Sequence, residues 1–229
     1  MEDKLTLSPI AHMESDFPTK FGIPRQSGIA HLASRIVFEK EYRQPEAFRG
    51  LENYSHLWII WGFSEVKRER WSATVRPPRL GGNVRMGVFA TRSPFRPNPL
   101  GLSSVKLISI QQDEKNGVSL VVEGADLMDG TPIYDIKPYI PYTDSHPEAV
   151  GGFADDVRKD RLKVEIPDEL LALVPGDKQD ALLSILRHDP RPHYQNDPER
   201  LYGFFFAGME IKFRVEADVL KVVSIEFPA

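Results

Sequence analysis

Short runs of apolar and β-branched residues, separated by turns rich in Gly, Pro, Asn and Asp, recur along the first 145 residues. The clearest run is 56–63, which contains two Trp and two Ile and is too short for a buried helix. Its tryptophans are expected in a core. Similar runs predict further strands at 5–7, 29–38, 100–110, 118–124 and 133–141. One short helix is expected, at 45–51. This succession predicts a mainly β fold, a barrel or a sandwich, rather than βαβ units.

The pattern changes after residue 142. Residues 143–160 are polar and acidic, which is typical of a linker or a loop. Beyond them the spacing predicts a helix with an apolar stripe that includes Leu182 and Leu186, with Asp177 as its N-cap. The elements expected in this part are helices at 167–174 and 177–188 and strands at 201–207, 209–216 and 219–227. We therefore expect a β-rich domain, a barrel or a sandwich, over 1–145 and a small α+β domain over 151–229.

Composition removes several classes of chemistry. The 229 residues include no Cys, which excludes disulfides, thiolate nucleophiles, Cys-based zinc sites and iron–sulfur clusters. The six His show no close pair of the kind that holds a metal, so no metal is expected. The chain starts without a signal-peptide pattern and contains no apolar run long enough to span a membrane. A cytoplasmic protein is the expectation.

Charge is distributed unevenly. The chain has a formal net charge of −4, yet residues 66–112 contain nine Lys or Arg and a single acid, Glu69. Such a block predicts a localised positive patch and an anionic partner.

Three stiff loops carry the candidate chemistry. Residues 87–102 hold Arg92 and Arg96 among three prolines, which restrict the backbone before any ligand binds. The other two loops are Pro24-Arg25-Gln26 and the acidic turn 126–131. Guanidinium groups bind carboxylate or phosphate, and an aspartate can accept ribose hydroxyls. These parts fit S-adenosylmethionine and a nucleotide equally well. No glycine-rich dinucleotide or P-loop motif is present.

The segments 75–83 and 87–101 closely resemble the TsaA-like (YaeB) family. Residues 126–132 and 135–139 match its second signature, and 189–194 is similar to the C-terminal part of its bacterial members. The resemblance implies a β-barrel methyltransferase of non-Rossmann type that forms a homodimer. Its implied reaction transfers a methyl group from S-adenosylmethionine to N6 of the adenosine at position 37, beside the anticodon, in tRNA that carries the threonylcarbamoyl group.

The resemblance also implies a set of cofactor contacts. In this sequence they are Pro24, Arg25, Gln26, Ser64, Glu65, Arg92, Leu102, Asp126, Leu127, Met128 and Asp129.

The remaining roles are hypotheses. Because an acylated N6 has a more acidic proton, a base could contribute, and Asp135 and Tyr134 are the candidates. Period-2 alternation places Asp135 with Lys137 on one strand face. The side chains suited to tRNA phosphates are Arg76, Arg79, Arg85 and Arg96. Two alternatives stay open, a non-catalytic RNA-binding barrel and an enzyme that acts on a small anionic nucleotide.

Overall fold

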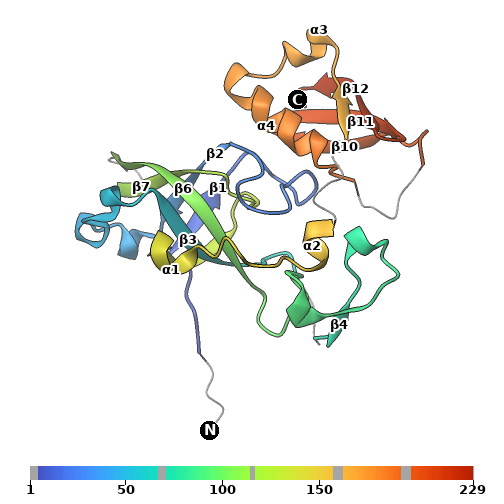
Figure 1. Ribbon diagram of the computed structural model, residues 1–229. Coiled ribbons are helices and arrows are strands. Elements are labelled where there is room, and N and C mark those ends of the chain that lie inside the picture. The colour runs from blue at the N-terminus through green and yellow to red at the C-terminus, as the bar shows by residue number, and fades with distance from the viewer. Residues whose placement is uncertain (1–4, 67–70, 114–116, 157–161, 192–196, 229) are drawn as a thin grey trace.

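The computed structural model describes residues 5–66, 71–113, 117–156, 162–191 and 197–228. Two sheets dominate it, a larger one built from the first 138 residues and a smaller one near the C-terminus (Figure 1). The prediction of a mainly β chain is confirmed.

The larger sheet closes into a barrel. Its strands pair antiparallel in the order β1 (Ala11–Glu14), β2 (Ala33–Phe38), β7 (Gly117–Glu123), β6 (Leu100–Asp113), β3 (His56–Gly62) and β8 (Pro132–Pro138). The ring closes because β8 also pairs with β1. Alternate apolar side chains point inward and form one core. Its fully buried members include Met13, Ile36, Leu57, Ile59, Leu120 and Ile133.

Short elements connect these strands. The expected helix at 45–51 is instead a pair of 3₁₀ turns, η2 (Pro45–Phe48) and η3 (Leu51–Asn53), which follow η1 (Lys40–Tyr42). Between β3 and β6 the chain forms a two-stranded ribbon outside the barrel. This excursion consists of β4 (Thr74–Val75), η4 (Pro78–Leu80), β5 (Met86–Gly87) and η5 (Val88–Ala90).

The smaller sheet has the order β10 (Tyr202–Phe206), β11 (Met209–Glu216), β12 (Val219–Glu226) and β9 (Lys163–Glu165). The first three strands are antiparallel, and β9 runs parallel to β12. Helices α3 (Asp168–Leu171) and α4 (Gly176–Arg187) accompany it, and α4 buries Leu182 and Leu186 in the core of this sheet. Asp177 is not the N-cap, because the helix starts directly after Pro175 and no side chain caps it.

Residues from the N-terminal part also pack in this second core. Phe17, Ala30 and Leu32 are buried with the side chains of β10 to β12. The Phe17 and Phe206 rings lie 5.6 Å apart, centroid to centroid. The loop between β1 and β2 therefore carries its apolar side chains out of the barrel and into the C-terminal sheet.

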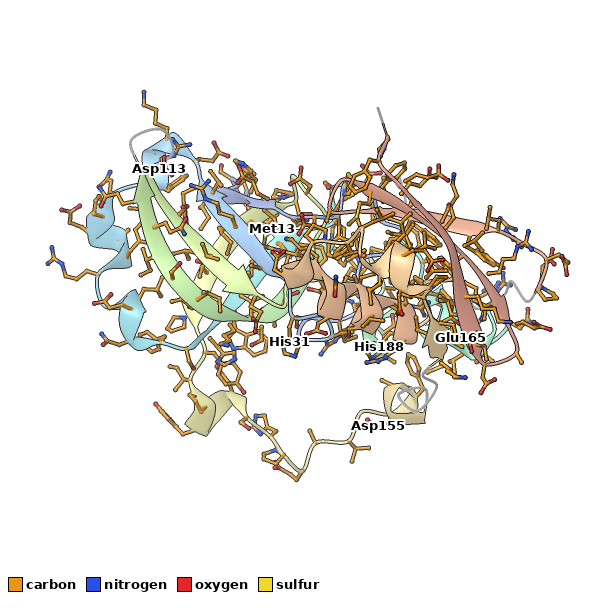
Figure 2. All side chains as sticks on the ribbon, turned by 90° about the horizontal axis from the view of Figure 1, so that it is seen from above. Met13, His31, Asp113, Asp155, Glu165 and His188 are labelled. Carbon is orange, nitrogen blue, oxygen red and sulfur yellow. The ribbon has the colours of Figure 1, made fainter. Side chains whose placement is uncertain are left out.

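An exposed arm follows β8. It contains α1 (Pro141–Asp144) and α2 (Phe153–Asp156) and runs to Asp155, away from the barrel wall (Figure 2). Its start is fixed by Asp144, whose Oδ2 accepts hydrogen bonds from the Ile140 main chain at 2.9 Å and from Trp58 Nε1 at 2.8 Å. These bonds lower the pKa of Asp144. The predicted loop over 143–160 thus contains short helical turns, and 157–160 lie outside the described residues.

One predicted strand is wrong. Residues 5–7 are not paired, and Leu5 is 84% exposed. The first strand is β1, whose sequence Ala-His-Met-Glu has little β preference of its own. Its pairing on both sides, with β2 and β8, determines its conformation. No helix within the described ranges is both long and apolar enough to cross a membrane.

Candidate functional site

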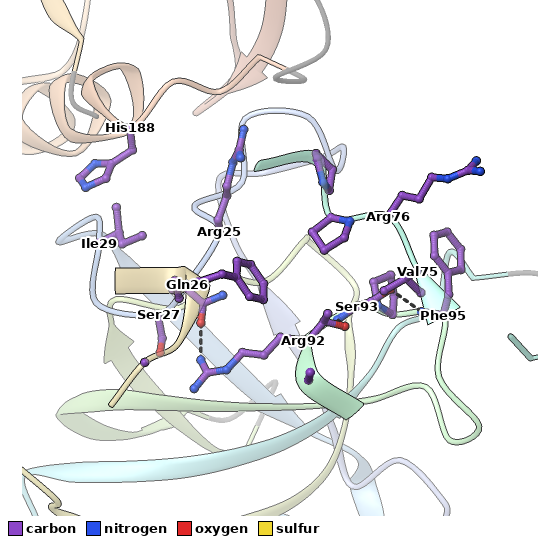
Figure 3. A pocket seen from close by; sticks show the side chains of 18 of the residues that line it. Arg25, Gln26, Ser27, Ile29, Val75, Arg76, Arg92, Ser93, Phe95 and His188 are labelled. Carbon is purple, nitrogen blue, oxygen red and sulfur yellow. Dashed lines mark hydrogen bonds between the residues drawn. The ribbon is translucent and has the colours of Figure 1, made fainter. Parts of the chain in front are cut away.

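A cleft of about 1810 Å³ lies where the barrel loops, the β4–β5 ribbon, α2 and the C-terminal end of α4 meet (Figure 3). Six arginines and one carboxylate, that of Asp155, are among the described residues that line it. The arginines are Arg25, Arg76, Arg85, Arg92, Arg187 and Arg191. A cleft with this lining attracts anions strongly, because its walls concentrate positive charge.

Two of the stiff loops meet inside the cleft. Arg92 Nη1 donates a hydrogen bond to Gln26 Oε1, as Figure 3 shows. The loop that carries Arg92 is braced by Arg96, whose Nη1 donates to the Thr91 main-chain oxygen at 3.0 Å. Arg96 was predicted to contact tRNA phosphates, and here its guanidinium supports the loop without lining the cleft.

Asp126 lies behind these loops, in the turn that follows β7. Its Oδ1 accepts a hydrogen bond from Ser103 Oγ at 2.6 Å, and the main chain of Ser27 donates to the same carboxylate. Burial raises the pKa of Asp126, against the opposing effects of Ser103, Arg92 and Ser27. Ser27 and Arg92 both line the cleft, so the Asp126 carboxylate interacts with two residues of its wall without lining it.

Arg25 is also at the cleft but is turned toward the C-terminal part. Its Nη2 donates to the main-chain oxygens of Asp189 at 3.0 Å and Arg191 at 2.7 Å. Figure 3 shows its guanidinium pointing away from the Gln26–Arg92 pair. Arg25 thus holds the 189–191 turn against the loop that carries Gln26.

The other predicted cofactor residues occupy varied positions. Pro24 lines a neighbouring pocket of about 150 Å³ together with Arg25, and Leu102 is 56% exposed on β6. Leu127 is buried in the barrel core, and its main-chain oxygen accepts a hydrogen bond from Ser15 Oγ at 2.9 Å.

The end of the acidic turn is used internally. Asp129 Oδ1 accepts from the Ser15 main chain at 3.0 Å, and the Met128 oxygen accepts from Thr131 Oγ1 at 2.7 Å. Ser64 and Glu65 form an exposed turn after β3 and do not line the cleft.

Both candidate bases lie on β8 outside the lining of the cleft. Asp135 forms an ion pair with Lys137 at 2.9 Å, which agrees with their predicted position on one strand face. The Tyr134 ring covers Gly62 of β3, where a Cβ would come within 2.7 Å of it. Their assignment as bases stays a prediction.

Among the arginines predicted for tRNA, Arg76 and Arg85 line the cleft. Arg85 Nη1 lies 3.4 Å from Thr74 Oγ1, across the β4–β5 ribbon. Arg79 belongs to η4, and its side chain lies outside the described part of the chain. Lys67, Arg68 and Arg70 of the basic block lie outside it as well.

Sequence reasoning expected the C-terminal part to assist tRNA binding but named none of the residues that it contributes to the cleft. Arg187 and His188 come from the end of α4, and Arg191 follows directly. Arg191 is held by Asp189 through paired hydrogen bonds, Nε to Oδ1 and Nη2 to Oδ2, each 2.9 Å, and both side chains are buried. The signal was available in the Asp-Pro-Arg-Pro turn; its last residues, 192–194, lie outside the described ranges.

The fold and the site define a class, a β-barrel protein with a basic cleft suited to an anionic ligand. Comparison with known proteins makes this specific. The model of the tRNA-methyltransferase O N-terminal domain matches residues 12–145, and that of the TrmO C-terminal domain matches 159–228. The chain belongs to the TrmO family.

Individual relatives agree with this assignment. A tRNA (adenine(37)-N6)-methyltransferase of Escherichia coli (strain K12) is 39% identical, over 95% of this chain and 96% of its own length. An S-adenosyl-L-methionine-binding protein of Archaeoglobus fulgidus is 34% identical, over 61% of this chain and 93% of its own. The crystal structure of TrmO from Pseudomonas aeruginosa superposes with a TM-score of 0.80 and 31% identity, covering 100% of this chain and 99% of that one.

Proposed function

We propose that this protein transfers a methyl group from S-adenosylmethionine to N6 of the adenosine at position 37 of tRNA, next to the anticodon. Membership of the TrmO family supports the reaction, since the relative from Escherichia coli carries that activity in its name. The observation that carries the proposal in this chain is the basic cleft lined by the Gln26–Arg92 pair, behind which the Asp126 carboxylate accepts a hydrogen bond from the main chain of Ser27.

The residues present fit a zwitterionic nucleoside. Arg92 supplies a positive charge for a carboxylate, and Asp126 supplies acceptors for hydroxyl groups. The cleft volume of about 1810 Å³ leaves room for a nucleotide of tRNA beside a cofactor of this size. When bound, S-adenosylmethionine supplies the electrophilic methyl group.

The chain's own contribution is positioning. The Pro-rich loop around Arg92 and the bonded loop at Gln26 are held before any ligand arrives, which lowers the entropic cost of aligning two reactants. Arg76, Arg85 and Arg187 line the same cleft and are suited to phosphate groups of the RNA. The adenine must leave its stack to reach the methyl group. Asp135 and Tyr134 stay the candidates for accepting the N6 proton.

The finer parts of the proposal concern the state of the substrate and of the protein. We propose that the substrate adenosine carries the threonylcarbamoyl group, that the protein acts as a homodimer and that it works in the cytoplasm. We also propose that the barrel, 1–145, holds the cofactor and that the C-terminal part, 151–229, assists tRNA binding. Arg187, which lines the cleft at the end of α4, supports this last role.

The decisive experiment uses tRNA from a strain that lacks this gene. Labelled S-adenosylmethionine is supplied with the purified protein, and the nucleosides are separated by mass spectrometry. Label on N6 of threonylcarbamoyladenosine is expected. Arg92→Ala should abolish it, whereas Arg49→Ala, at an exposed arginine after η2, should not.

Other outcomes distinguish the alternatives. If the protein retains tRNA at low salt but transfers no label, an RNA-binding module is the better assignment. Binding of nucleotides without any affinity for tRNA would indicate an enzyme that acts on a small anionic nucleotide.

A further inference from the structure

A chain of hydrogen bonds runs from the barrel core to Asp126, whose carboxylate also accepts from the main chain of the cleft residue Ser27. Trp61 Nε1, on β3, donates to Ser103 Oγ on β6 at 3.0 Å, and Ser103 Oγ lies 2.6 Å from Asp126 Oδ1. Trp61 is 9% exposed and Ser103 is 2% exposed. The first link is therefore inside the barrel, and the second reaches the turn that follows β7.

The direction of each bond follows from the donors available. An indole N–H can only donate, so it occupies an acceptor position of the Ser103 oxygen. The hydroxyl hydrogen is then left to point at Asp126, which accepts it best as a carboxylate. A protonated Asp126 could still accept this hydrogen bond through its carbonyl oxygen, but the bond would lose the charge that strengthens it.

The indole is in turn held by the backbone opposite it. Trp61 pairs with Gly101 across β3 and β6, and a Cβ at Gly101 would overlap the indole ring. Only glycine lets the ring lie across β6 and aim its nitrogen at Ser103. The orientation of Ser103 thus depends on Trp61 and Gly101, which do not line the cleft.

We infer that Ser103, oriented by Trp61, is a positioning residue that keeps the Asp126 carboxylate charged and directed to the loops that carry Gln26 and Arg92. Three elements each contribute one group that interacts with the carboxylate. Ser103 comes from β6, the Ser27 main chain comes from the β1–β2 loop, and Arg92, the charged group among them, comes from the loop after η5. Burial opposes the charge, which is why the hydrogen bond from Ser103 matters.

This inference rests on the proposed function only for the identity of the ligand. The charge of Asp126 can be read without it, from the titration of its ¹³C carboxyl signal by NMR in the free protein. Ser103→Ala should move this titration to higher pH, because a hydrogen bond to the charged form is lost. Ser103→Thr, which keeps the hydroxyl, should restore the original midpoint. The matched control is Ser34→Ala, at a buried hydroxyl on β2 with no hydrogen-bond partner among the described residues.

Calorimetry with S-adenosylmethionine then tests the consequence for the site. For Ser103→Ala we expect affinity to fall roughly tenfold near neutral pH and to recover as the pH rises, since a hydrogen bond to a charged group is involved. Ser34→Ala should bind as the unaltered protein does. The inference is wrong if Ser103→Ala changes neither the titration of Asp126 nor the way in which the affinity for S-adenosylmethionine falls at low pH.

A second variant covers the case in which Ser103→Ala does not fold. Trp61→Phe removes the indole N–H but keeps an aromatic ring, so the Ser103 hydroxyl is free to turn away. Its Asp126 titration should move in the same direction by a smaller amount, and an unchanged titration would overturn the inference. The titration could also move as expected while neither the unaltered protein nor any variant binds S-adenosylmethionine. In that case the proposed function is wrong, but the role of Ser103 stands.

Discussion

The guanidinium of Arg25 donates to the main-chain oxygen of Arg191 at 2.7 Å, although the two residues are 166 positions apart. A second bond from the same nitrogen reaches the oxygen of Asp189. Together they join the loop that carries Gln26 to the turn at the end of α4. An arginine predicted to contact the cofactor therefore also secures the contact between two parts of the chain.

Arg25→Ala should destabilise the protein by about 2 kcal/mol, because two part-buried main-chain oxygens lose a charged donor. Urea denaturation measures this change. Arg25→Lys, which lacks the planar fork, should recover only part of it. The control is Arg214→Ala, at an exposed position of β11, which should stay within about 0.5 kcal/mol of the unaltered protein. Equal effects of Arg25→Ala and Arg214→Ala would contradict the assigned role.

Asp126→Asn should raise the thermal midpoint at pH 7 while weakening cofactor binding. The pKa of Asp126 is raised in the folded protein by burial. A raised pKa contributes stability below the unfolded pKa, and this contribution is lost as the pH rises through the folded pKa. The neutral amide avoids that loss. The difference in midpoint between the two proteins should therefore shrink as the pH is lowered, which a series of thermal scans between pH 4 and pH 8 would reveal.

A midpoint for Asp126→Asn below that of the unaltered protein at pH 7 would argue against this explanation. It would mean that the hydrogen bonds from Ser103 and Ser27 stabilise the charged form by more than burial opposes it.

Arg76→Ala should weaken tRNA binding and reduce its dependence on salt. Each phosphate contact that is removed lowers the slope of log K against log salt by about 0.9 for a duplex region and by about 0.7 for a single strand. Filter binding between low and moderate salt gives this slope. The affinity for S-adenosylmethionine should be unchanged. Lys163→Ala, at an exposed lysine that pairs with Glu165 in the second sheet, serves as the control and should keep the original slope.

Gly101→Ala should cost about 1–3 kcal/mol of stability, because the added methyl group overlaps the Trp61 indole and the strand pair must shift. Tryptophan fluorescence should change as well. Gly87→Ala is a matched control in the same Pro-rich region, since a Cβ there meets nothing within 4 Å and φ is −57°. A comparable cost at both glycines would show that the indole is not the reason.

Much of the barrel could be predicted because most of its strands have a β preference in their own local sequence. Runs such as His56–Gly62 and Gly117–Glu123 are rich in residues that favour strands, and they appear where expected. Ala11–Glu14 and Lys163–Glu165 were missed because neither has such a preference. Both depend on partners distant in sequence, β8 for the first and β12 for the second.

The residues of the candidate site also fall into those that local sequence predicts and those that it does not. Arg92 and Gln26 were predicted from stiff loops, and the structure brings them together. Ser103, Arg187 and Arg191 were not predicted. A serine in an apolar strand gives no local signal of its role, and a residue at the end of a helix reaches the cleft only through the packing of the second sheet.

The burial of Phe17, Ala30 and Leu32 beneath the C-terminal sheet has a consequence for how such a chain can be shortened. The spans of the two family models, 12–145 and 159–228, suggest two modules that evolution could separate by a single cut. A chain shortened there would lack the second sheet and would expose these three apolar side chains to water. Relatives such as that of Archaeoglobus fulgidus match 61% of this chain over 93% of their own length. We expect polar residues at the positions equivalent to these three in any relative that lacks the second sheet, so the presence or absence of that sheet should be readable from the sequence of the barrel alone.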